Sequence, residues 1–165
     1  MDNMFKPKSL SIGKMPWLKP LARYMIVIAI ANLVWEFAQM PLYTLWNMGT
    51  TAEIAFAAMH CTGGDILIAL LAIVSAIVLI GKFRWPLERR FPVLVFTVLL
   101  GFAYTWFSEW FNIEVRGSWA YGDMMPIVPV INMGFSPFLQ WTILPIIAFL
   151  WTLRGQGAAG GQEKL

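Results

Sequence analysis

Four long runs of apolar residues dominate the chain, separated by shorter segments that are richer in charge, glycine or proline. Each run approaches the roughly 20 residues that a helix needs to cross the hydrocarbon core of a bilayer. The runs cover roughly residues 21–46, 65–83, 91–112 and 137–153. This pattern predicts an all-α, polytopic membrane protein with four transmembrane helices, the first of them a retained span.

Two segments between the runs carry structure of their own. Residues 50–59 read TTAEIAFAAM, and Thr50 with Glu53 has the spacing of a capping box. A short helix is therefore expected there, which either continues past Gly63 and Gly64 into the second run or breaks at them.

The segment 124–136 is apolar but is interrupted by Pro126, Pro129 and Gly134. This composition favours an interfacial or re-entrant segment packed against the helices. Pro145 lies inside the fourth run and is expected to kink it.

Basic residues mark one side of the membrane. Eleven of the twelve Lys and Arg residues fall in the N-terminal arm 1–20 and the start of the first run, the loop after the second run, and the C-terminal segment. By the positive-inside rule both termini are expected in the cytoplasm, and we expect a bacterial inner membrane. The chain then divides into the basic arm 1–20, one four-helix domain over 21–154, and a disordered tail 155–165.

Composition agrees with this assignment. Hydrophobic residues make up 59% of the chain and charged residues 13%, which is too few charges to cover the surface of a water-soluble domain. The single Cys excludes an internal disulfide and a cysteine-rich metal site. The net charge of +3 gives no nucleic-acid signal, because the positive charges lie at expected membrane edges.

Polar side chains interrupt the first and third runs at helical spacing. Both stripes follow the intervals four, three and four, so each occupies one face of its helix. On neighbouring helices they are expected to face each other in the outward half of the bundle. The stripes consist of Asn32, Glu36, Gln39 and Tyr43 in the first run, and of Thr105, Glu109, Asn112 and Arg116 in the third.

More ionisable residues are expected at the same end, namely His60, Asp65, Glu114 and Asp123. A charged side chain at bilayer depth costs about 3 kcal/mol or more, so such residues usually have a function. Where two carboxylates lie close together, one often holds a proton, which makes an acid/base pair. Plainer interpretations remain open: Glu36 as a helix-packing contact, Glu109 with Arg116 as an ion pair, and His60 as an interfacial residue.

Few cofactor sites fit the sequence. One His and the absence of a Glu-x-x-His pair disfavour a metal site, although carboxylates and His60 are ligand types for iron or manganese. No phosphate-binding glycine loop, nucleophile elbow or dinucleotide fingerprint is present. We expect no metal and no cofactor.

Two short stretches resemble membrane cyclases that act on isoprenoids. Residues 31–36, Ala-Asn-Leu-Val-Trp-Glu, resemble the Asn-x-x-Trp-Glu element of the small integral-membrane terpene cyclases of fungal meroterpenoid pathways. This resemblance implies that Glu36 protonates the substrate. Residues 112–121 resemble the Asn-x-x-x-x-Gly-x-Trp-x-Tyr pattern of membrane lycopene cyclases, which implies pocket roles for Asn112, Gly117, Trp119 and Tyr121.

Three functions follow as hypotheses. The first is an enzyme that acts on a membrane lipid or isoprenoid through carboxylate acid/base chemistry. The second is a subunit or assembly factor of a larger membrane complex, with a protein partner or a homo-oligomer. The third is a small transporter or proton-conducting protein. For the enzyme, the expected catalytic residues are Glu36, Glu109, Glu114, His60 and Asp65, and the expected substrate-binding residues are Asn32, Gln39, Tyr43, Asn112, Arg116, Trp119, Tyr121 and Asp123.

Overall fold

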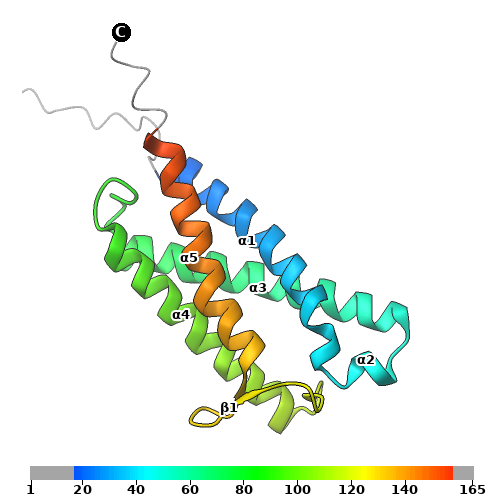
Figure 1. Cartoon of the computed structure of the whole chain (residues 1–165). Helices are drawn as coiled ribbons and strands as arrows, with labels where there is room; N and C mark the ends of the chain where they lie inside the picture. The colour runs from blue at the N-terminus through cyan, green and yellow to red at the C-terminus, as the bar shows by residue number, and fades with distance from the viewer. Residues whose placement is uncertain (1–16, 158–165) are drawn as a thin grey trace, which may run out of the picture.

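The computed structural model describes residues 17–157 and, for side chains, residues 17–154. Helices make up most of this part, and the prediction of an all-α protein is confirmed (Figure 1). The elements in chain order are α1 Leu18–Gln39, the 3-10 turn η1 Met40–Leu42, α2 Leu45–Met48, α3 Thr51–Leu79, α4 Arg90–Trp110, the π-helical turn η2 Phe111–Val115, the strands β1 Ile127–Val128 and β2 Met133–Gly134, and α5 Phe135–Gly157.

Four of these helical stretches are long and apolar enough to cross a membrane, as the sequence predicts: 18–42, 51–79, 90–115 and 135–154. The faces of these helices that point away from the bundle interior expose large apolar side chains, among them Ile26, Ile30 and Val34 on α1. Exposed apolar faces of this kind suit contact with lipid.

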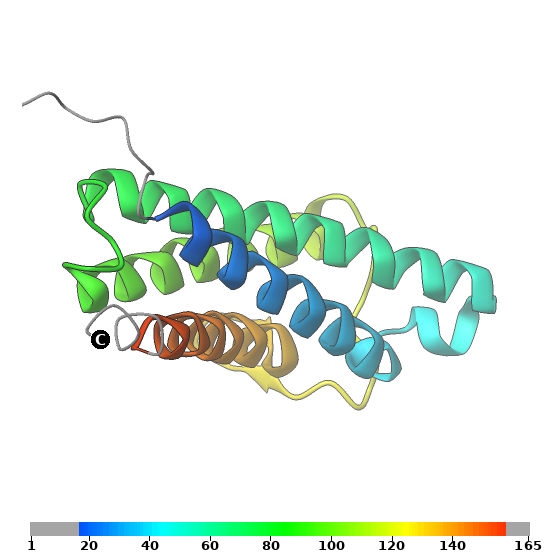
Figure 2. The ribbon, with the colours of Figure 1, turned by 90° about the horizontal axis from the view of Figure 1, so that it is seen from above.

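The four long helices form a closed bundle. α1 packs against α3 and α5, and α4 packs against the same two helices from the other side (Figure 2). α1 and α4 therefore stand diagonally across the bundle axis. This corrects the expectation that the two helices with polar stripes are neighbours. The stripes instead face each other across the interior of the bundle.

The start of α3 lies well before the apolar run that predicts it. Thr50 and Glu53 form the expected capping box: the Glu53 amide donates to Thr50 Oγ1, and the Thr50 amide donates to a Glu53 carboxylate oxygen at 2.8 Å. The helix then continues without a break through Gly63 and Gly64, which have open space around them. The short helix expected over residues 50–59 and the second span are one element.

The proline-containing segment forms a small hairpin. β1 pairs antiparallel with β2, Ile127 opposite Gly134 and Val128 opposite Met133. The Trp106 indole N–H donates to the carbonyl of Ile131 at 2.9 Å and ties this hairpin to α4. The segment is thus packed on the end of the bundle opposite the α3–α4 loop, between α4 and α5 (Figure 1).

α5 continues through Pro145 without interruption. It reaches Gly157, so residues 155–157 of the expected disordered tail belong to this helix. Most of the basic arm and the rest of the tail, residues 1–16 and 158–165, lie outside the described residues.

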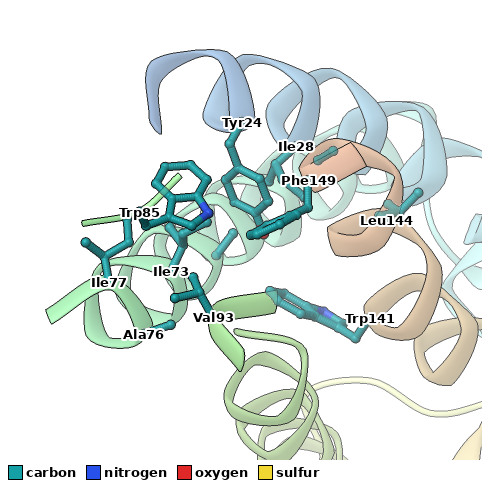
Figure 3. Packing of buried hydrophobic residues seen from close by; sticks show 12 residues of the cluster. Tyr24, Ile28, Ile73, Ala76, Ile77, Trp85, Val93, Trp141, Leu144 and Phe149 are labelled. Carbon is teal, nitrogen blue, oxygen red and sulfur yellow. The ribbon is translucent and has the colours of Figure 1, made fainter. Parts of the chain in front are cut away.

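One half of the bundle has a densely packed apolar core. The cluster lies toward the end that carries the basic α3–α4 loop (Figure 3). Trp85 enters it from that loop, fully buried, with its ring centroid 5.6 Å from that of Phe149. Gly101 on α4 leaves room for the ring of Trp141 on α5, which a Cβ at this glycine would contact. Helices in lipid associate through such close packing.

Gly101→Ala is expected to destabilise the protein by about 1–3 kcal/mol, because the Trp141 ring must move to admit the methyl group. Gly63→Ala is the matched control on α3. Its Cβ would meet nothing within 4 Å, so it is expected to stabilise the helix by about 0.5–1 kcal/mol. Thermal unfolding in detergent, followed by tryptophan fluorescence, measures both. Equal melting temperatures for the two variants would contradict this packing.

Candidate functional site

The other half of the bundle is hollow. A cavity of about 730 Å³ opens between α1, α3, α4 and α5 at the end opposite the apolar core. Its volume lies within the range of roughly 300–1,000 Å³ that small-molecule sites occupy. Nine of the residues expected at the site line it: Glu36, Gln39, Tyr43, His60, Asp65, Glu109, Asn112, Arg116 and Trp119.

Three carboxyl groups from three different helices are buried around this cavity. Glu36 on α1 is 4% exposed, Asp65 on α3 is 8% exposed and Glu109 on α4 is 9% exposed. Arg116 also lines the cavity but is exposed, and the Glu109–Arg116 ion pair, one of the interpretations left open by the sequence, is not formed. In the described part of the chain, the single ion pair joins Arg84 to Glu88 at the other end of the bundle. The buried carboxyl groups therefore have no basic partner there.

The side-chain amide of Gln140, on α5, lies at the centre of the hydrogen-bond network beside α1. Gln140 Nε2 lies 2.8 Å from Asn32 Oδ1, 2.9 Å from Glu36 Oε1 and 2.8 Å from Asp65 Oδ2. Gln39 Nε2 donates to the same Glu36 oxygen at 2.8 Å. Glu36 and Asp65 are thus neighbours held by a shared donor. Asn32 does not line the cavity and is linked to the two carboxyls through Gln140.

Glu109 belongs to a second arrangement on the α4 side. The Tyr121 hydroxyl donates to Glu109 Oε2 at 2.5 Å and accepts from the backbone N–H of Gly134 at 2.9 Å. Tyr43 packs against the Tyr121 ring with centroids 5.6 Å apart, and the two residues form a backbone bridge. Burial, and then the negative charge of Glu109, raise the pKa of Tyr121 well above its usual value. Tyr121 therefore serves Glu109 as a neutral hydrogen-bond donor.

A smaller hollow of about 420 Å³ lies under the hairpin. Glu114, Tyr121 and Asp123 line it, and Glu109 lines both hollows. The structure thus separates Glu114 and Asp123 from the main cavity. Both are exposed, and they lie outside the group of buried carboxyls.

The rim of the main cavity carries different chemistry from its floor. His60 and Arg116 are both exposed, and the His60 ring stacks on Phe56 with centroids 5.7 Å apart. Within the residues described, no group of three His, Cys, Asp or Glu side chains has the geometry to hold a metal ion. Deeper in the cavity, the buried hydroxyl of Thr105 has no hydrogen-bond partner among the described atoms and is available to a ligand.

Sequence reasoning missed the residues of α5. Ser136, just before the fourth run, and Gln140, inside it, are one helical turn apart at the start of α5, and both bond to the stripe on α1. A +4 pair of polar residues in an apolar run is the same signal that identifies the other two stripes. Applied to the fourth run, it would have found them.

Comparison of this chain with protein-family models, curated proteins and solved structures gave no match. The resemblance to membrane cyclases therefore stays a prediction, and the assignment of function rests on the geometry and chemistry of the site.

Proposed function

We propose that this membrane protein is an enzyme that isomerises or cyclises a lipid-soluble, alkene-containing substrate of the isoprenoid type by carboxylate acid/base chemistry. One observation carries the proposal: Glu36, Asp65 and Glu109 face a single ligand-sized cavity while buried and without a basic partner among the described residues. Burying a carboxyl in a membrane bundle costs free energy, and neutral amides can make the same structural contacts without that cost.

The surroundings of the carboxyls suit an apolar substrate. Trp119, Tyr43 and Phe56 place aromatic rings at the cavity wall, among other apolar side chains. Aromatic faces and carboxylates stabilise a developing carbocation in a site of low dielectric. The rim residues Arg116 and His60 would hold a polar end of the substrate at the outward mouth, which leaves the apolar part inside.

The reaction balances without a cofactor. A carboxylic acid of the Glu36–Asp65 pair gives its proton to one alkene carbon, which forms a C–H bond and a carbocation. The cation shifts or is attacked by a second alkene, which closes a ring. A carboxylate, assigned to Glu109, then removes a proton from an adjacent carbon and a new C=C bond forms. The product is an isomer of the substrate, because the substrate gains one proton in the first step and loses one proton in the last.

Two alternatives predict other features of the bundle. A transporter needs a polar path across the membrane, whereas below the cavity the described helices pack through the apolar cluster. The single chain therefore offers no such path among its described residues. A subunit of a larger complex would use the cavity as a contact for a partner helix. We propose a monomer or homo-oligomer, with both termini on the cytoplasmic side of a bacterial inner membrane.

Deuterium from solvent tests this function. Purified protein in lipid vesicles is incubated in D2O with a lipid extract of its own membrane, and the lipids are analysed by mass spectrometry. We expect a product that is isomeric with a substrate and carries one non-exchangeable deuterium on carbon, absent with heat-unfolded protein. If no lipid gains carbon-bound deuterium, the proposed chemistry is wrong.

A further inference from the structure

The orientation of the amide at the centre of the site is determined from both ends of a hydrogen-bond chain. At one end, Asn32 Nδ2 donates to the backbone carbonyl of Ile28 at 3.0 Å. A carbonyl only accepts, so the Asn32 nitrogen must lie on that side. Its Oδ1 atom then faces Gln140 and requires a donor, which Gln140 Nε2 supplies at 2.8 Å.

The other end of the chain begins at a group that only donates. The Trp35 indole N–H donates to Ser136 Oγ at 3.1 Å. The Ser136 hydroxyl in turn donates its hydrogen to Gln39 Oε1 at 2.8 Å. This turns Gln39 Nε2 toward Glu36 Oε1, at 2.8 Å, and toward Gln140 Oε1, at 3.4 Å. Both ends therefore give Gln140 the same orientation.

A count of hydrogens now shows a deficit. Gln140 Nε2 carries two hydrogens, but three oxygens lie within 2.9 Å of it, those of Asn32, Glu36 and Asp65. Gln140 therefore cannot serve all three oxygens, and Glu36 Oε1 receives its hydrogen from Gln39 Nε2 at 2.8 Å. The Glu36 and Asp65 carboxyls are themselves within hydrogen-bonding reach of each other. With both carboxyls ionised, two negative charges would lie in contact in a buried site without an ion-pair partner among the described residues, and one shared proton removes this repulsion.

We infer that Glu36 and Asp65 share one proton in the resting protein, and that Gln140 is the positioning residue that holds the pair in place. The charge around the pair agrees with this. Glu109, Tyr43 and Cys61 line the cavity beside it, and the two basic residues of the lining, His60 and Arg116, are exposed at the rim and form no ion pair with it. The use of this proton in catalysis rests on the function proposed above. In that function the Glu36–Asp65 pair is the acid, and it is protonated before the substrate binds.

Infrared spectroscopy of purified protein in vesicles tests the inference without a substrate. A protonated carboxyl has a C=O stretching band that shifts when H2O is replaced by D2O. We expect this band at neutral pH in the wild type, and its loss in both Glu36→Gln and Asp65→Asn. Each amide supplies hydrogens of its own, so the network closes without the shared proton. Glu109→Gln should keep the band of the pair.

A variant of the positioning residue separates this account from a purely structural role. Gln140→Met keeps the length of the side chain but removes its two donors. The band should persist and move to higher frequency, because the carboxyls lose hydrogen bonds. Absence of the band in the wild type, or a band unchanged by both Glu36→Gln and Asp65→Asn, would overturn the inference. A band without deuterium transfer to lipid would instead leave the shared proton standing and contradict the enzyme.

Discussion

Glu36→Gln is expected to reduce the transfer of solvent deuterium to lipid by roughly 100-fold to 10,000-fold, the range that a positioned general acid supplies. Glu36 is almost fully buried at the floor of the cavity, beside Asp65 and between two amide donors. Glutamine has the same shape but no acidic proton. The fold should therefore remain, and the protein should purify with an unchanged melting temperature.

Glu88→Gln is the matched control for this change. Glu88 is exposed at the other end of the bundle and paired with Arg84. Its substitution is therefore expected to leave the activity unchanged. Full activity of Glu36→Gln on a substrate that the wild type deuterates would remove Glu36 from the role of acid. Loss of expression in Glu36→Gln alone would instead indicate a structural contact, since the isosteric amide can keep most hydrogen bonds.

Trp85→Ala is expected to have the opposite profile, with a loss of about 3–5 kcal/mol in the free energy of unfolding. The Trp85 ring fills the apolar half of the bundle and contacts Phe149, so its removal leaves a large cavity. The hollow half lies at the other end, so the native fraction should keep its activity per molecule. Unfolding by detergent titration measures the stability of the variant.

Trp85→Phe controls for the indole nitrogen. That N–H is buried without a hydrogen-bond partner among the described atoms, so a phenyl ring should cost far less than alanine. If Trp85→Ala were as stable as the wild type, the apolar cluster would not hold the helices together. If it lost all activity while folded, the two halves of the bundle would not be separable in function.

The four spans were predictable because an apolar run of about 20 residues is itself the physical requirement for crossing a bilayer. The gathering of Glu36 and Glu109 was predictable for a related reason. Polar side chains at helical spacing in such a run avoid lipid by facing the interior. The capping box of Thr50 and Glu53 predicted the start of α3 before its apolar run, because a cap depends only on local sequence.

Features that depend on how the helices pair were not predictable. Spacing along one helix cannot show that α1 and α4 stand diagonally, or that Gln140 on α5 bridges α1 and α3. The burial of Trp85 depends on the loop that turns back into the core, although tryptophan near a span end is typically an interfacial residue. The separation of Glu114 from the main cavity depends on the hairpin, whose position is a tertiary contact.

The most direct test of the account is native mass spectrometry of the protein purified gently from its own membrane. We predict one specific lipid-soluble molecule bound to a monomer or homo-oligomer. Its occupancy should fall in Thr105→Phe, because Thr105 lines the cavity and the larger ring would project into it. A stoichiometric partner protein of another kind, with no specific lipid in the wild type, would contradict the account and make this chain a subunit of a complex.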